Sequence, residues 1–299
     1  MKNIVEVLDS MPYNGAHETN MQATIDAYRA SSEKYLNDAD ALQTMFNSID
    51  LTTLSHTDSN KSVTAFVEKV NKFATEFPDL KNVGGICVYS VFAPVLRSKL
   101  KVDDVHRAVV AACFPSSQAF ADIKAAEVRK AVEAGATEVD VVISVGEFLD
   151  GEYQLVYEEL VGIREACKDA RLKVILETGA ILTFEQIWKA SVIAMEAGAD
   201  FIKTSTGKNC GGATPEAAIV MCEAIKEYVK KSGRKVGFKP AGGVSTAAEA
   251  CLYYEIVKSI LGNEWLVNTR FRIGASRLAN ALLAQILKVK GREAPEKFF

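Results

Sequence analysis

Eight short apolar runs recur along the chain at intervals of about 32 residues, between Asp50 and Arg272. Longer stretches with a helix-like pattern separate them. The runs are FNSIDLTT, VGGICVYSVF, AVVAACF, EVDVVISV, LKVILETG, DFIKTS, KVGFKPAGG and TRFRIGAS. Several are nearly continuous Val, Ile, Phe and Ala, which is typical of parallel strands that are covered on both faces. The alternation therefore predicts an α/β fold.

The stretches between the runs have apolar residues at three- and four-residue spacing, as in SSQAFADIKAAEVRKAVEAGA. In that stretch Ser117 suits a helix start, and Gly135 suits the position just after the helix end. Eight strand–helix units predict a (β/α)₈ TIM barrel, which normally takes ~250 residues. A doubly wound sheet is the competing architecture. It usually has fewer strands, and its glycine fingerprint would follow the first strand, where this chain has LTTLSHTDS.

Residues 1–47 precede the first expected strand and contain a polar, helix-compatible stretch, ETNMQATIDAYRASSEKYLNDADALQTMF. We interpret them as an N-terminal helical extension that caps the barrel bottom or joins an oligomer interface. Residues 48–299 then form the barrel domain. No internal repeat, low-complexity tract or break in composition indicates a further domain.

Composition narrows the class of partner. The 35 Lys and Arg residues nearly balance the 38 Asp and Glu residues, giving a net charge of −3, which argues against a nucleic-acid partner. No apolar run approaches the ~18 residues of a membrane span, and the first residues match no targeting leader. The six cysteines form no CxxC pair and have no nearby histidines, so we expect no metal site, no cofactor and reduced thiols in a cytoplasmic protein.

Three charged residues lie where the fourth, sixth and seventh strands end, namely Asp140, Lys203 and Lys239. Catalytic side chains of a barrel are placed at these carboxyl ends. A lysine inside an apolar strand needs a reason, because burial of an unpaired ammonium is costly. An ordinary structural ion pair would be one reason, and two lysines on adjacent strands make that reading weaker.

The functional interpretation is a Schiff-base lysine. An amine nucleophile must be neutral, whereas free lysine has a pKa of ~10.4. Desolvation and a second cation both lower that pKa, and Lys239 is placed to be that cation for Lys203. Asp140 would transfer protons while the carbinolamine forms and loses water. Alternatively, Asp140 only holds a lysine in place.

Glycine-rich turns follow the last three expected strands: STGK, PAGGV and RIGAS. Glycines allow backbone N–H groups to approach an anion closely, and barrels build phosphate sites after strands seven and eight. Such turns also favour glycine without any ligand. Three in succession, with Lys208 and Ser276 beside them, predict a phosphate site.

Seven motifs together resemble the deoxyribose-phosphate aldolase family: IDLTTL, CVYSVF, EVDVV, LKVILETG, DFIKTSTGK, GFKPAGGV and FRIGAS. The resemblance runs from about residue 45 to 290 and includes every expected strand in order. It implies a class I, metal-independent lyase on a (β/α)₈ barrel. Such an enzyme reversibly cleaves 2-deoxy-D-ribose 5-phosphate, a small phosphorylated sugar, to D-glyceraldehyde 3-phosphate and acetaldehyde.

The resemblance also implies site residues. Lys203 matches the Schiff-base lysine, Lys239 the residue that lowers its pKa, and Asp140 the proton-transfer acid. Asp50 and Cys87 match pocket-lining positions, and Thr204 lies next to the Schiff base. The positions that match the phosphate site are Gly207, Lys208, Gly242, Gly243, Gly274 and Ser276.

Two departures from the family pattern concern the tail and the phosphate site. Family members commonly end in a flexible tail with a terminal tyrosine that helps to protonate the enamine. This chain ends in Phe298 and Phe299 and has no tyrosine after Tyr254. Water held by Asp140 and Lys239 is the expected substitute. Arg277 follows Ser276 where a second serine is usual, and it either strengthens phosphate binding or points outward.

Other functions stay open at this point. One is an aldolase-like protein with slow or absent turnover that serves as a binding or scaffold protein. Another is a Schiff-base aldolase or transaldolase with a different sugar phosphate. Assembly as a homo-oligomer such as a dimer is also left open. The three histidines, His17, His56 and His106, are expected to be surface or turn residues rather than general bases.

Overall fold

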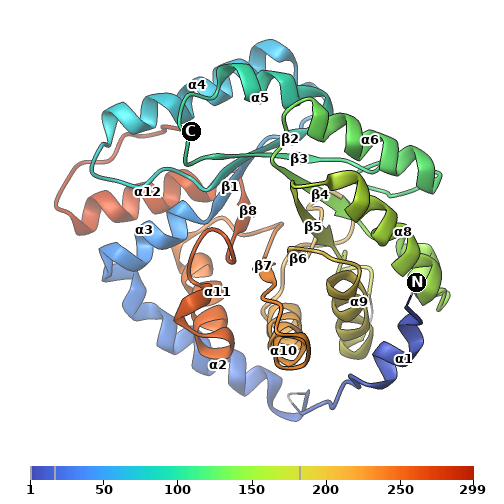
Figure 1. The fold of residues 1–299 in the computed structure, drawn as a ribbon. Coiled ribbons are helices and arrows are strands. Elements are labelled where there is room, and N and C mark those ends of the chain that lie inside the picture. Colours follow the sequence, from blue (N-terminus) through green and yellow to red (C-terminus); the bar gives the residue numbers. More distant parts are fainter. Residues whose placement is uncertain (1, 17, 182) are drawn as a thin grey trace.

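Eight parallel strands form the centre of the molecule, and helices surround them (Figure 1). The structure is a computed structural model that describes residues 2–16, 18–181 and 183–299. The strands are β1 Ile49–Thr52, β2 Gly85–Tyr89, β3 His106–Val110, β4 Glu138–Val142, β5 Arg171–Ile175, β6 Phe201–Lys203, β7 Gly237–Lys239 and β8 Ile273–Ala275. Their order is β7-β6-β5-β4-β3-β2-β1-β8. Two bridges, Phe238 to Phe271 and Ala241 to Gly274, connect β7 with β8. The predicted TIM barrel is confirmed.

The helices that follow the strands cover the barrel. They are α4 Asn60–Glu76, α5 Ala93–Lys99, α6 Ala121–Glu133, α7 Val145–Leu149, α8 Tyr153–Cys167, α9 Phe184–Glu196, α10 Pro215–Ser232, α11 Ala247–Leu261 and α12 Leu278–Val289. Threonine side chains cap α9, α10 and α11 at their first turns. In the part of the chain that the structure describes, no helix is both long and apolar enough to cross a membrane.

Ser117 does not begin a helix, so that prediction was wrong. The helix α6 begins at Ala121, and the residue before it is Phe120. Ser117 instead has a φ of 59° and donates its hydroxyl to the carbonyl of Val142 at the end of β4. Its hydrogen bond is therefore used to hold the β3–α6 loop against the neighbouring strand. Gly135 does follow the end of α6, with a φ of 115°.

The chain before β1 forms helices that lie along the outside of the barrel helices (Figure 1). These are α1 Ile4–Asp9, α2 Met21–Ser32 and α3 Ala39–Asn47. α1 contacts α8 and α9, α2 contacts α11, and α3 contacts α11 and α12. Two buried polar contacts join this segment to the barrel helices: Tyr35 donates to Glu255 at 2.6 Å, and Trp188 donates to the carbonyl of Met11 at 2.8 Å. The division into an extension of residues 1–47 and a barrel of residues 48–299 remains a proposal.

The carboxyl end of the chain is held against α12 and α4. Asn280 on α12 accepts hydrogen bonds from the backbone N–H groups of Phe298 and Phe299, at 2.9 and 3.0 Å. Both terminal rings pack on Phe73 of α4, and Phe299 is only 6% exposed. The tail of this chain is thus part of the core packing.

We expect Phe299→Ala to lower the free energy of unfolding by roughly 3 kcal/mol, because truncation of a buried aromatic ring loses burial and leaves a cavity. Urea unfolding followed by circular dichroism measures this change. Phe120→Ala is the matched control, since that ring is 82% exposed and its loss should be nearly neutral. Equal stabilities for the two variants would contradict the packing of the tail.

Candidate active site

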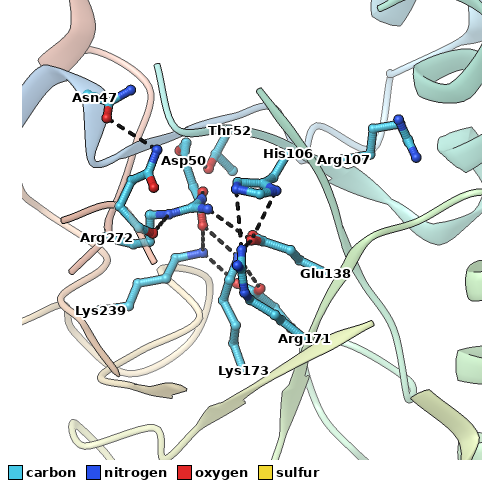
Figure 2. A network of polar contacts seen from close by, with 12 residues as sticks. Asn47, Asp50, Thr52, His106, Arg107, Glu138, Arg171, Lys173, Lys239 and Arg272 are labelled. Carbon is cyan, nitrogen blue, oxygen red and sulfur yellow. Dashed lines mark hydrogen bonds and ion pairs between the residues drawn. The ribbon is translucent and has the colours of Figure 1, made fainter. Parts of the chain in front are cut away.

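Charged side chains fill the inside of the barrel. Six of them are completely buried, three acids and three bases: Asp50, Glu138, Asp140, Lys173, Lys239 and Arg272. They come from β1, β4, β5, β7 and the residue just before β8. Figure 2 shows Asp50, Glu138, Lys173 and Lys239 pointing toward one another inside the barrel. Buried charges need partners of opposite sign, and each of these has at least one.

The contacts in the deeper part of this cluster are dense. Arg272 forms ion pairs with Asp50 and, at 2.8 Å, with Glu138. The ammonium of Lys173 lies 2.9 Å from Asp50 and also contacts Glu138 and Asp140. Burial alone would lower the pKa of Lys173, but the three carboxylates outweigh it and raise that pKa. Lys173 is therefore a fixed cation.

Lys203 lies at the other end of the cluster, where the strands reach their carboxyl ends. Its Nζ is 2.8 Å from Oδ2 of Asp140, and the same oxygen lies 2.7 Å from Nζ of Lys239. Lys239 also contacts Asp50. The pairing register places Lys203 beside Lys239 on the adjacent strand. Both lysine side chains therefore reach the same oxygen, Oδ2 of Asp140.

The charge balance of the buried cluster explains why Lys203 and Lys239 differ in pKa. Three carboxylates face three fixed cations, Lys173, Lys239 and Arg272, so an ammonium on Lys203 would be a fourth positive charge. Burial and then the charge of Lys239 lower the pKa of Lys203, against the attraction of Asp140. For Lys239, burial also lowers the pKa, but Asp140 and Asp50 together raise it. Lys203 is the lysine that loses its proton first.

Asp140 remains ionised in this arrangement. Burial raises the pKa of its carboxyl group, but Lys173, Lys203 and Lys239 overcome that effect and hold the pKa well below its usual range. Asp50 is likewise held well below its usual pKa, because Arg272, Lys173 and Lys239 outweigh its burial. Both carboxylates can therefore accept hydrogen bonds, and a proton on either one is short-lived.

A cavity of about 240 Å³ opens above Lys203. Its walls come from the ends of β1, β6, β7 and β8: Thr52, Leu54, Lys203, Thr206, Gly207, Lys208, Ala241, Gly242, Gly243, Val244, Ser245, Gly274, Ala275, Ser276 and Arg277. None of these lining residues is acidic, and two besides Lys203 are basic, namely Lys208 and Arg277. The cavity also lies at the amino end of α12. Positive side chains and a helix amino terminus favour an anionic ligand.

Two glycines allow the walls of the cavity to lie close together. At Gly242, φ is 85°, and an added Cβ would lie 3.0 Å from the Cα of Gly212 in the loop after β6. At Gly274, an added Cβ would lie 2.8 Å from that of Ala241. The prediction placed Gly274 in a turn after the eighth strand, but it lies within β8, where it pairs with Asp50 of β1.

Lys208 connects two loops at this cavity. Its ammonium donates to the backbone carbonyl of Leu54, at 2.6 Å, in the loop after β1. A carbonyl oxygen does not neutralise an ammonium, so Lys208 keeps its positive charge for a ligand. Six residues predicted for a phosphate site, Gly207, Lys208, Gly242, Gly243, Gly274 and Ser276, all line this cavity.

Three further predicted residues, Asp50, Cys87 and Thr204, lie behind the cavity wall. Asp50 belongs to the buried cluster. The hydroxyl of Thr204 exchanges hydrogen bonds with the backbone of Ala241, at 3.0 and 3.1 Å, and so joins β6 to β7. Burial and then Asp140 raise the pKa of the Cys87 thiol to about 11, so this group is not a thiolate at neutral pH. Substrate contact by these residues stays a prediction.

Sequence reasoning missed Glu138, Lys173 and Arg272 as members of the cluster. A signal was present, because Glu138 and Lys173 each lie at an alternate position in an apolar strand. Glu138 is two residues before Asp140, and residues two apart on a strand face the same side. The strand register also places Asp140 opposite Lys173.

The histidine predictions have different outcomes. His56 is exposed in a turn, as expected, and His17 lies outside the described residues. His106 begins β3 and lies at the deep end of the cluster, with Nδ1 3.7 Å from Glu138 and Nε2 3.3 Å from Arg171. Burial, which Glu138 opposes only in part, lowers the pKa of His106. It is thus a neutral, partly buried neighbour of the cluster.

Comparison with known proteins shows that this chain is similar to aldolases. The profile of the DeoC/LacD family aldolases matches residues 44–260. The deoxyribose-phosphate aldolase of Homo sapiens is 42% identical over 258 residues, which is 82% of this chain and 81% of the human protein. A solved chain from Toxoplasma gondii is 22% identical and superposes with a TM-score of 0.74 over 84% of this chain and 95% of that chain, a likeness of fold. The tetrameric deoxyribose phosphate aldolase of Aeropyrum pernix is 25% identical, with a TM-score of 0.64 over 83% of this chain and 97% of that one.

Proposed function

The chain belongs to the DeoC/LacD family of aldolases, and we propose that it reversibly cleaves 2-deoxy-D-ribose 5-phosphate to D-glyceraldehyde 3-phosphate and acetaldehyde through a Schiff base on Lys203. The observation that carries this proposal is the position of Lys203. It is a buried lysine of lowered pKa at the floor of a cavity whose other charged residues are cationic. A neutral amine below an anion-binding cavity suits attack on the carbonyl carbon of a phosphorylated sugar.

The reaction begins when the neutral amine of Lys203 attacks the aldehyde carbon. The carbinolamine that forms must lose its hydroxyl group as water, which requires a proton. Lys239 remains protonated, and Asp140 contacts both lysines through one oxygen. Asp140 therefore relays protons between Lys239 and the reacting group, directly or through a bound water. The iminium at C1 then withdraws electrons, so that the C2–C3 bond of the sugar breaks while the C3 hydroxyl gives its proton to a base such as Asp140 or a bound water.

The first product, glyceraldehyde 3-phosphate, leaves an acetaldehyde enamine on Lys203. That enamine gains a proton at carbon and is hydrolysed, which releases acetaldehyde and restores the amine. Phe298 and Phe299 are held by Asn280 and carry no phenol for this step. Water next to Asp140 and Lys239 supplies the proton instead.

The phosphate of the substrate would occupy the cationic part of the cavity. Backbone N–H groups of the glycine turns, the amino end of α12 and the ammonium of Lys208 all suit an anion there. Binding at this remote group orients the reacting carbons at Lys203. A substrate without the phosphate should therefore react poorly even though the chemistry at Lys203 is unchanged.

A direct assay tests the proposed function. Purified protein is incubated with 2-deoxyribose 5-phosphate, and both aldehydes are measured as they form. Formation of the two products in equal amounts is the expected result. Absence of both, with the phosphosugar still bound, would instead support the binding or scaffold role. Faster cleavage of another sugar phosphate would assign the site to a different aldolase reaction.

We expect Arg277→Ser to raise KM for 2-deoxyribose 5-phosphate about fivefold and to leave kcat within about twofold, since a charged hydrogen bond to the phosphate contributes roughly 1 kcal/mol or more. Arg277 lines the cavity, and the structure gives it no ion pair among the described residues. Steady-state kinetics of the cleavage measure both constants. Arg29→Ser is the matched control, because Arg29 is an exposed arginine on α2. An unchanged KM would mean that Arg277 points away from the substrate.

Three further features belong to the same proposal. We place the enzyme in the cytoplasm, with a small phosphorylated sugar as its partner and no nucleic acid. The Aeropyrum pernix relative is tetrameric, and we propose a homo-oligomer, such as a dimer, for this chain. Light scattering on the purified protein measures the oligomeric state, and a mass equal to one chain would contradict it.

A further inference from the structure

The mechanism leaves one buried carboxylate near the cavity without a role, that of Glu177. It follows β5 at its carboxyl end and is 3% exposed. Its φ is 56°, a left-handed backbone conformation that residues other than glycine and asparagine rarely adopt. Backbone strain of this kind persists only where the surrounding structure enforces it, and it is concentrated at functional sites.

Both oxygens of Glu177 accept hydrogen bonds from a single residue of the cavity wall. Oε1 accepts from the backbone N–H of Thr206 at 3.1 Å, and Oε2 accepts from the Thr206 hydroxyl at 2.6 Å. The Thr206 oxygen then accepts from the backbone N–H of Lys208 at 3.1 Å. A chain of hydrogen bonds thus runs from Glu177 to the backbone of Lys208, and Thr206, Gly207 and Lys208 all line the cavity.

No lysine or arginine among the described residues forms an ion pair with Glu177. A buried carboxylate without a cation is costly unless hydrogen bonds satisfy it, and here Thr206 supplies them. Gly179, two residues after Glu177, allows the loop after β6 to pack closely here. An added Cβ at Gly179 would lie only 1.8 Å from the carbonyl oxygen of Cys210 in that loop. The turn after β5 and the loop after β6 are therefore fitted closely to each other.

We propose that Glu177 is a positioning residue that fixes the Thr206–Lys208 wall in the conformation that binds the phosphate group of the substrate. This inference rests on the proposed function, because the phosphate is the group for which the wall is shaped. Glu177 does not touch the reacting carbons. It acts through Thr206, and its effect falls on binding of the phosphate end rather than on the chemistry at Lys203.

The test uses two variants and a matched control in the full-length protein. Glu177→Ala removes the carboxylate, and Thr206→Val removes the hydroxyl with little change in volume. The control is Thr178→Val, next to Glu177, because the Thr178 hydroxyl is buried with no hydrogen-bond partner among the described residues. Calorimetry measures the Kd of inorganic phosphate for each protein. Kinetics are measured with 2-deoxyribose 5-phosphate and with unphosphorylated 2-deoxyribose.

We expect Kd for phosphate and KM for the phosphosugar to rise about tenfold in Glu177→Ala and severalfold in Thr206→Val, as for loss of hydrogen bonds from a charged buried group. The kcat/KM for unphosphorylated 2-deoxyribose should stay within about twofold in both. Thr178→Val should match the unchanged protein in every measurement. Glu177→Gln keeps an acceptor for the Thr206 N–H and should recover part of the lost affinity.

Two results would overturn the proposal. One is an unchanged KM and Kd in both Glu177→Ala and Thr206→Val. The other is an equal loss of activity on the phosphorylated and unphosphorylated sugars, which would assign Glu177 a general structural role. Calorimetry separates this outcome from failure of the proposed function. If the unchanged protein binds phosphate but cleaves neither sugar, the aldolase proposal fails while the effect of Glu177 on phosphate binding can still be measured.

Discussion

Lys203→Met is expected to abolish cleavage of 2-deoxyribose 5-phosphate, with a fall in kcat of roughly 10⁴-fold or more, because no other group replaces the nucleophile in covalent catalysis. The same variant should be as stable as the unchanged protein. Asp50, Glu138 and Asp140 are balanced by Lys173, Lys239 and Arg272 without any contribution from Lys203. Loss of Lys203 therefore leaves no uncompensated charge inside the barrel.

The two measurements are a cleavage assay and a urea unfolding curve on the same preparation. Lys203→Arg is the companion variant, since a guanidinium remains protonated and forms no imine. It should be equally inactive and less stable, because it adds a permanent fourth cation to a cluster with three carboxylates. Retention of substantial activity in Lys203→Met would contradict the assignment of the nucleophile. Strong destabilisation of that variant would contradict the charge balance.

Lys239→Met is expected to reduce kcat about 10²- to 10³-fold at neutral pH, in line with loss of a proton-transfer partner, and to move the acid limb of the pH profile to higher pH. In the unchanged protein the charge of Lys239 helps to lower the pKa of Lys203. Without Lys239, the negative charges of Asp140 and Asp50 are no longer balanced. They then favour the protonated form of Lys203. Its pKa rises, and a higher pH is needed to obtain the neutral amine.

The measurement is kcat/KM against pH for both proteins. Lys124→Met is the matched control, because Lys124 is also a buried lysine but lies between α6 and α8, where it contacts Ser144 and Glu159. It should be destabilised without a shift in the pH profile. A Lys239→Met profile that keeps its acid limb in place would show that Lys239 does not control the charge of Lys203.

The barrel could be predicted from the sequence because its signal is repeated eight times. Each apolar run encodes a strand by itself, and the spacing between runs leaves room for one helix. The strand positions of Lys203 and Lys239 follow from their place at the end of such runs, and that of Asp140 follows from its place inside one. Their closeness in space then follows from the barrel, since the carboxyl ends of parallel strands meet at one face.

Other parts of the site depend on contacts that one segment cannot reveal. Lys173 becomes a fixed cation only because three acids from β1 and β4 surround it. Ser117 looks like a helix cap, but its hydroxyl is used by the carbonyl of Val142 on the next strand. Glu177 resembles any acid at a strand end until the fold places Thr206 beside both of its oxygens.

The central claim is that Lys203 forms a covalent imine with the substrate. The protein is incubated with 2-deoxyribose 5-phosphate, the imine is reduced with borohydride, and the modified peptide is mapped by mass spectrometry. We predict one adduct, on the peptide that contains Lys203, and none in Lys203→Met. An adduct confined to Lys239 or Lys208, or active turnover with no trapped adduct, would contradict the account.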